Sequence, residues 1–71
     1  MVNVNKLKGK IVECGKSVAE VSEEIGVDKA TLYRKLSNSG SFTLGEADAI
    51  TKSLNLSKED AVAIFFAQYV A

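Results

Sequence analysis

Apolar residues recur at intervals of three and four along most of this 71-residue chain, the spacing that gathers side chains on one face of an α-helix. The clearest pattern lies in residues 17–37, where two such faces follow each other. Their apolar positions are Val18, Val21 and Ile25 on the first, and Leu32 and Leu36 on the second. No stretch alternates apolar and polar residues for long enough to predict a β-strand. The pattern therefore predicts an all-α fold with short helices at 18–25 and 29–37.

Capping residues separate these two central helices. Ser17 followed by Glu20 is a capping box, in which the serine hydroxyl accepts a hydrogen bond from a free amide of the first turn and the carboxylate reaches back to the cap. Gly26 is the residue type that adopts the left-handed conformation at a helix end without a steric penalty. Asp28 is positioned to cap the second helix. The sequence thus predicts two helices joined by a tight turn.

Three further helices are predicted, at residues 4–14, 44–54 and 58–69. The residues predicted to cap their starts are Asn3 or Asn5, Thr43 with Glu46, and Ser57. The positions predicted to be buried are Val4, Leu7, Ile11 and Cys14 in the first helix, and Leu44, Ala47, Ile50 and Leu54 in the next. Gly9 lies inside the first helix, where glycine lowers helix stability, and the close approach of a neighbouring element would explain it.

The last predicted helix carries two apolar stripes instead of one. The first stripe consists of Ala61, Ile64 and Phe65, and the second of Val62, Phe66 and Tyr69. One stripe is enough to close a core of this size, and an uncovered apolar stripe is typical of an interface. We therefore expect a homodimer that forms through Val62, Phe66 and Tyr69. The alternative is an enlarged core, in which Phe66 and Tyr69 fold over the first helix.

Length and composition fit one small globular domain spanning residues 1–71. Hydrophobic residues make up 46% of the chain and charged residues 25%, as in an ordinary folded domain. One cysteine and no histidine exclude a disulfide within the chain and argue against a zinc site. Cys14 is therefore expected to be a small core residue in a reducing compartment. Residues 1–15 lack the long apolar run of a signal peptide or membrane anchor, which predicts a cytoplasmic protein without membrane contact.

Catalytic chemistry has little support in the sequence. Without histidine, no base pairs with a nucleophile, and the acidic residues stand at helix starts or on polar faces, where capping explains them. No glycine-rich phosphate loop and no cluster with metal-ligand spacing occurs. We expect a protein that is not an enzyme, needs no cofactor and binds no small-molecule ligand.

Charge is unevenly distributed, although nine basic and nine acidic residues give a net charge of zero. Residues 1–16 and 27–45 are basic, whereas residues 17–26 and 46–71 are acidic. This distribution permits a basic face on a neutral molecule. Such a face favours contact with a polyanion, although less strongly than a basic domain would.

The stretch VAEVSEEIGVDKATLYRKL resembles the helix-turn-helix of the lambda-repressor-like family, also called the XRE family, which includes the Cro and cI-type phage repressors. GSFTLGEADAITKSLNLSKEDAVAIFF is similar to the two closing helices of that family. The resemblance covers residues 5–66. It implies a compact five-helix DNA-binding domain, encoded by a phage or prophage, that regulates transcription in the bacterial host cell.

The resemblance also implies where double-stranded DNA binds. The helix over residues 28–37 would enter the major groove, where its outward side chains would meet base edges. The expected base contacts are Lys29, Ala30, Tyr33 and Arg34. Arg34 is best suited to bidentate donation to guanine, while Lys29 would do the same or reach a phosphate. The expected contacts to the DNA backbone are Ser17, Lys35, Asn38, Ser39, Ser41 and Lys6. For Lys6 and for the loop residues, the alternative is a purely solvating role.

A second interpretation keeps the fold but changes the partner. Some small phage regulators of this type bind the DNA-binding domain of a repressor protein and modulate it. Zero net charge, the second apolar stripe of the last helix and Val18, which cannot donate a hydrogen bond to a phosphate, all fit that role. Tyr33 and Arg34 are residue types favoured at protein interfaces as well as at base edges, so the sequence leaves the choice of partner open.

Overall fold

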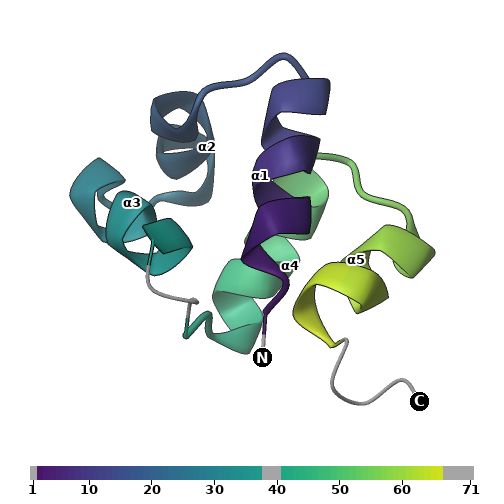
Figure 1. Ribbon diagram of the computed structural model, residues 1–71. Helices are drawn as coiled ribbons and strands as arrows, with labels where there is room; N and C mark the ends of the chain where they lie inside the picture. The colour runs from purple at the N-terminus through teal and green to yellow at the C-terminus, as the bar shows by residue number, and fades with distance from the viewer. Residues whose placement is uncertain (1, 38–40, 67–71) are drawn as a thin grey trace.

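This computed structural model describes residues 2–37 and 41–66. These residues form five α-helices with connecting loops and contain no β-strand. The helices are α1 (Val4–Glu13), α2 (Val18–Ile25), α3 (Lys29–Ser37), α4 (Leu44–Ser53) and α5 (Lys58–Phe65). Figure 1 shows α1 and α4 at the centre, with α2 and α3 on one side and α5 on the other. The all-α prediction is confirmed. None of these described helices has the length and apolar character that a membrane crossing requires.

Side-chain caps start four of the helices, as predicted, and the Asp28 carboxylate accepts an amide hydrogen bond in the first turn of α3. The Ser17 hydroxyl accepts a hydrogen bond from the amide of Glu20, and the Glu20 carboxylate accepts one from the amide of Ser17. Thr43 opens α4 with the same reciprocal pair. Asn3 and Ser57 each accept one amide hydrogen bond at the starts of α1 and α5. Because these bonds satisfy amides that a helix start leaves free, they set the four boundaries.

Helix ends agree with the prediction less closely than helix starts. The ends of α1 and α4 each fall one residue before the predicted position, at Glu13 and Ser53. Asn55, with φ 50°, lies just beyond α4, as expected of a stop. The helix α5 ends at Phe65 rather than at residue 69. Phe66 has φ −127° and ψ 23°, which is outside the helical range, and residues 67–69 lie outside the described part.

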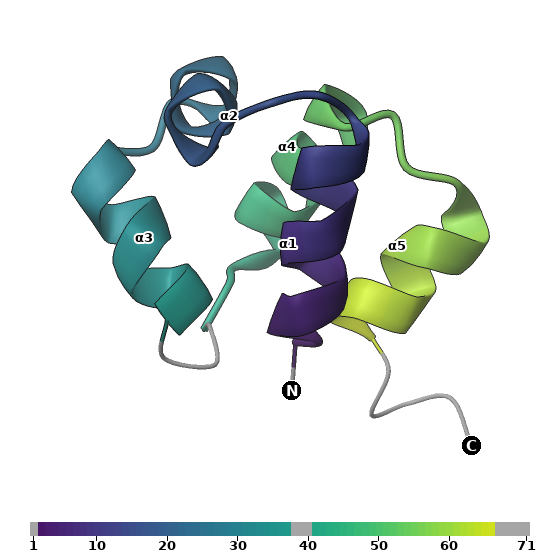
Figure 2. The ribbon, with the colours of Figure 1, turned by 45° about the horizontal axis from the view of Figure 1, so that its top comes forward.

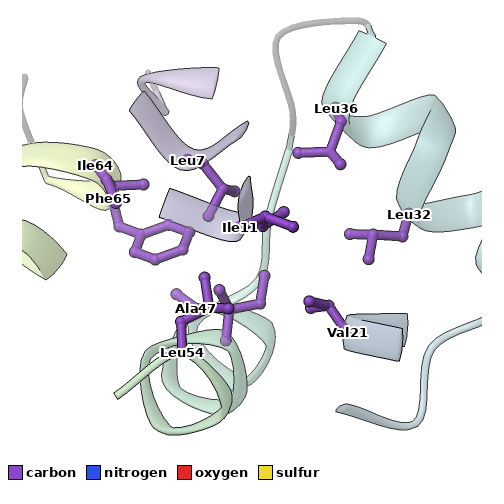
Figure 3. Packing of buried hydrophobic residues seen from close by; sticks show 10 residues of the cluster. Leu7, Ile11, Val21, Leu32, Leu36, Ala47, Leu54, Ile64 and Phe65 are labelled. Atoms are coloured by element: carbon purple, nitrogen blue, oxygen red, sulfur yellow. The ribbon is translucent and has the colours of Figure 1, made fainter. Parts of the chain in front are cut away.

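One apolar core joins all five helices (Figure 3). Its buried residues are Leu7, Ile11, Val21, Leu32, Leu36, Ala47, Ile50, Leu54, Ile64 and Phe65. Leu32 and Leu36 point inward from α3, on the side of the core that Ile11 and Val21 line. The helix α1 lies between α3 and α5 and contacts both (Figure 2). The core therefore fixes the inner face of α3 and leaves its opposite face uncovered.

A polar cluster links the start of α2 to the ends of α2 and α4. The ammonium of Lys16 lies 2.7 Å from Oε1 of Glu24 and donates to the carbonyl of Ser53 at 2.8 Å. The hydroxyl of Ser53 donates to the same Glu24 oxygen at 2.7 Å. The hydrogen bond from Lys16, followed by the one from Ser53, lowers the pKa of Glu24 below its ordinary value. These bonds hold α2 against α4 and so position the turn that leads into α3.

Two positions predicted to be buried are exposed. Cys14 forms the C-terminal cap of α1, and its thiol lies 3.5 Å from the carbonyl oxygen of Leu54. Leu44 is the first residue of α4 and is 75% exposed. Both stand at a helix end, where helical spacing no longer places the side chain on the buried face. The prediction of a core role is therefore wrong for both residues.

The two apolar stripes of α5 have different surroundings. Ile64 and Phe65 of the first stripe are buried, and the Phe65 ring meets the Phe42 ring edge to face with 5.9 Å between centroids. Val62 of the second stripe is half-buried, and Phe66 is 36% exposed. Tyr69 lies outside the described residues. The first stripe thus belongs to the core, while an interface through the second stripe stays a prediction.

Alanine at Gly9 and at Gly26 should change stability in opposite directions. An added Cβ meets no atom within 4 Å at either position, so a close neighbour does not explain Gly9. Gly9 lies in the interior of α1, where alanine should raise the free energy of unfolding by roughly 0.5–1 kcal/mol. Gly26 has φ +73°, and alanine there should lower it by about 1–2 kcal/mol. Urea denaturation of both variants measures the two effects, and shifts of the same sign would contradict this account.

Acid should destabilise the fold as pH falls below about 4.5, the ordinary pKa of a glutamate. Lys16 lowers the pKa of Glu24, and Lys10 lowers that of Asp60. A carboxylate with a lowered pKa in the folded state stabilises that state above its ordinary pKa, and the contribution is lost as the folded carboxylate takes up a proton. Urea denaturation should therefore give similar unfolding free energies at about pH 7 and about pH 5, and a smaller one at about pH 3. The Glu24→Gln variant should show a weaker dependence, and a flat profile for the wild type would be inconsistent with these ion pairs.

Candidate nucleic-acid interface

The uncovered face of α3 brings the four predicted base contacts together. Those residues are Lys29, Ala30, Tyr33 and Arg34, and all four are exposed. Their spacing places them on neighbouring positions of one helix surface, while Leu32 and Leu36 are buried on the other side. The Asp28 carboxylate accepts a hydrogen bond from the amide of Ala30 at 3.0 Å, which orders the first turn of the helix. The result is a rigid polar surface that contains one large ring, because the Tyr33 side chain is 51% exposed.

The helix α2 supports α3 through a small residue and a glycine turn. Ser22 of α2 is buried. Its hydroxyl donates a hydrogen bond to the carbonyl of Ala19 at 2.7 Å, so this polar group is satisfied within its own helix. Gly26 has φ 73° and ψ 27°, the left-handed conformation that the sequence predicts. The amide of Val27 then donates to the carbonyl of Ser22 at 3.0 Å. These contacts set the angle between α2 and α3, and with it the direction in which the α3 surface faces.

Positive charge without a carboxylate partner is concentrated around α3. Among the described residues, the cations within 4.0 Å of a carboxylate oxygen are Lys6, Lys10, Lys16, Lys35 and Lys52. The cations without such a carboxylate in the described ranges are Lys8, Lys29, Arg34 and Lys58. Lys29 and Arg34 lie on the outer face of α3, and Lys8 lies on the surface of α1 that borders α3. The neutral chain therefore has a locally basic surface.

Lys35 has a partner within the protein instead of the free ammonium that a phosphate contact needs. Its Nζ lies 2.6 and 2.7 Å from the two carboxylate oxygens of Glu46 and 5.7 Å from the centroid of the Phe42 ring. The Lys35 and Glu46 side chains are only 18% and 19% exposed. Burial raises the pKa of Glu46, but hydrogen bonds from Lys35 and from the Thr43 amide outweigh burial and keep that pKa below its ordinary value. Lys35 thus joins α3 to the first turn of α4.

Lys6 faces α5 rather than α3. Its Nζ lies 3.8 Å from the carboxylate of Asp60, which also receives Lys10 at 2.9 Å. The hydrogen bond from Lys10 is the main cause that lowers the pKa of Asp60. A polyanion approaching Lys6 would meet this carboxylate as well. The structure therefore separates Lys6 from the basic surface around α3.

The other predicted backbone contacts have varied positions. Ser17 caps α2 and is exposed next to the groove between α1 and α3. Ser41 is exposed two residues before the cap of α4. Asn38 and Ser39 lie outside the described residues.

Lys8 is the residue of this surface that the sequence pattern missed. It follows buried Leu7 in α1, and the sequence favours solvation for Lys6, Lys8 and Lys10, with a phosphate contact near the helix start as the alternative. In the folded chain Lys8 borders the same groove as Tyr33 and Ser37 of α3. The packing of α1 against α3 brings it there, and helical periodicity within α1 carries no signal for that packing.

Comparison with protein-family models, with curated proteins and with solved structures finds no match to this chain. In the described part of the chain, no group of three or more histidine, cysteine, aspartate or glutamate residues is arranged to hold a metal ion.

The Lys35→Met variant should lower the free energy of unfolding by about 1–3 kcal/mol, because Glu46 would lose a charged partner in a mostly buried setting. The matched control is Lys52→Met. Lys52 pairs with Asp48 at 3.0 Å, but the two side chains are 77% and 64% exposed. That substitution should cost only about 0.3–0.5 kcal/mol. Urea denaturation of both variants provides the comparison, and equal losses would mean that Lys35 does not hold α3 to α4.

Proposed function

We propose that this protein is a DNA-binding transcription regulator of the lambda-repressor-like type, with α2 and α3 as its helix-turn-helix. The observation that carries the proposal is the outer face of α3. There Lys29 and Arg34 lack a carboxylate partner in the described structure and flank the exposed ring of Tyr33. Five of the other cations are engaged in ion pairs, so this face is where a polyanion would find available donors.

The dimensions and chemistry of α3 suit the DNA major groove. An α-helix with its side chains is about 10–12 Å in diameter, and the groove is about 12 Å wide. Arg34 would donate two hydrogen bonds to one guanine, and Ala30 would meet a thymine methyl group. Lys29, at the first turn, would reach a guanine or a phosphate. Tyr33 would add a large contact surface beside them.

Contacts to the DNA backbone would come from the residues around α3. The first turn of α2 presents free amides and the Ser17 hydroxyl, and helix starts of this kind favour phosphate. Ser41 would contact a backbone phosphate, and Asn38 and Ser39 stay predicted contacts of the same kind. Lys35 and Lys6 are not part of this proposal, because Glu46 and Asp60 already engage them.

A homodimer is the assembly that this mode of binding favours. One recognition helix buries little surface, and related half-sites are usually read by two copies of a domain. The partly exposed Phe66 and half-buried Val62 at the end of α5 suit such an interface, with Tyr69 as its predicted third member. We propose that the dimer acts in the bacterial cytoplasm as a phage or prophage regulator.

The Arg34→Ala variant should distinguish sequence-specific DNA binding from binding that depends only on overall charge. A duplex selected by the wild-type protein from a randomised pool serves as the ligand, and fluorescence anisotropy measures its affinity beside a scrambled duplex. Arg34→Ala should weaken binding to the selected duplex by about 1–3 kcal/mol and relax selectivity at one base pair. The control is Lys58→Ala, which removes an exposed cation on α5 and should leave the affinity nearly unchanged.

Equal affinity of the wild-type protein for both duplexes would contradict sequence-specific DNA binding. Equal losses in Arg34→Ala and Lys58→Ala would also contradict it, because binding would then depend only on overall charge. Either result would favour the alternative function, a modulator that binds a repressor protein. In that case Tyr33→Ala and Arg34→Ala should abolish co-elution with the repressor.

A further inference from the structure

A groove of about 480 Å³ lies between α1 and α3 and reaches the first turn of α2. Figure 2 shows these two helices side by side, with α2 near one end of both. Its apolar wall residues are Ile11, Val12, Val18, Tyr33 and Leu36. The groove adjoins the α3 surface that we assign to DNA but is not the same surface.

Exposed apolar side chains border this groove. Val12 is 76% exposed on the α1 side, and Tyr33 is 51% exposed on the α3 side. The only other large apolar side chains of comparable exposure in the described ranges are Leu44 and Phe66, which belong to α4 and to the cap of α5. Two large apolar groups on facing helices, with an apolar floor between them, offer a site that becomes more stable when another apolar surface covers it.

Two polar side chains of the groove, Ser37 and Lys16, already have partners within the chain. The hydroxyl of Ser37 already donates to the carbonyl of Tyr33 at 2.9 Å, and the Lys16 ammonium is engaged by Glu24 and by the Ser53 carbonyl. Lys8 is the cation at the groove that lacks a carboxylate within the described chain. One unpaired cation beside largely apolar walls is complementary to an apolar segment that carries a carboxylate.

We propose that this groove binds an apolar segment of a partner protein, which inserts large apolar side chains between Val12 and Tyr33 and places a carboxylate against Lys8. The apolar walls supply the affinity, because they remove exposed surface from water. The Lys8 ammonium fixes the orientation of the segment and selects acidic partners over basic ones.

Binding of this segment excludes DNA. Tyr33 belongs to both surfaces, so its ring cannot contact the segment and a base edge at the same time. This regulatory consequence depends on the proposed DNA-binding function, whereas the binding of the segment itself does not. A partner protein with such a segment would release the regulator from its operator.

A displayed library of random peptides of about 16 residues, roughly four helical turns, provides the probe. The library is selected against the wild-type protein without DNA, and each enriched peptide is synthesised and titrated into isotope-labelled protein. Enriched peptides should combine large apolar residues with a carboxylate. They should shift the amide signals of residues that line the groove in α1 and α3, and they should displace the selected duplex.

Matched variants test the site itself. Val12→Ser and Lys8→Glu should each weaken peptide binding by about tenfold or more. The controls are Leu44→Ser, at a residue 75% exposed on α4, and Lys58→Glu, at a cation on α5, and both should bind the peptide as the wild type does. These four positions are exposed, so folding should be retained, and circular dichroism checks it.

Several outcomes would overturn the proposal. Enriched peptides that bind Val12→Ser and Lys8→Glu as tightly as the wild type would show that the site lies elsewhere. If no peptide is enriched while both substitutions weaken DNA binding, the groove is part of the DNA surface. A peptide that binds in the groove without displacing DNA would overturn the exclusion alone. Because the peptide titration contains no DNA, a failure of the proposed DNA-binding function would leave its result unaffected.

Discussion

The burial of Leu32 and Leu36 is the constraint on which the rest of the structure depends. A helix of nine residues is too short to be stable in water by itself, so α3 keeps its shape only because its inner face packs against the core. The same packing determines which side chains face outward, because the side of α3 opposite these leucines contacts no other helix of the described structure. The chemistry of the α3 surface is therefore a consequence of core packing. Any change that loosens α3 should alter that surface even when no surface residue is replaced.

Ion pairs determine which cations remain available on this neutral chain. Lys10 and Lys16 fasten α1 and the loop after it to other elements, and Lys35 fastens α3 to α4. Each of these lysines contributes to the fold and is correspondingly less available to a ligand. Lys29 and Arg34 keep their charge free because α3 turns them away from the acidic segments of the chain. Net charge is consequently a poor guide to binding here, and the pairing of individual charges is a better one.

The sequence predicts local features of this fold well and features that depend on tertiary contacts poorly. Capping side chains act within a few residues, so the starts of the helices and the turn at Gly26 follow from the sequence. Helical spacing likewise separates the outer face of α3 from its buried leucines. Spacing fails at helix ends, where Cys14 and Leu44 are exposed. It also fails for lysines, since the partner of Lys35 is 11 residues away in sequence and lies on another helix. The groove between α1 and α3 has no sequence signal, because two packed helices create it.

We propose that the core holds α3 in the orientation in which its outer face contacts DNA bases. The most direct test is the change in amide chemical shifts when the selected duplex is added to isotope-labelled protein. We expect the largest changes in the first two turns of α3 and at the start of α2, with contacts between the Tyr33 ring and the duplex. The signals of buried core residues such as Leu32 should move little. Changes centred on α5, or equally small changes with selected and scrambled duplexes, would contradict it.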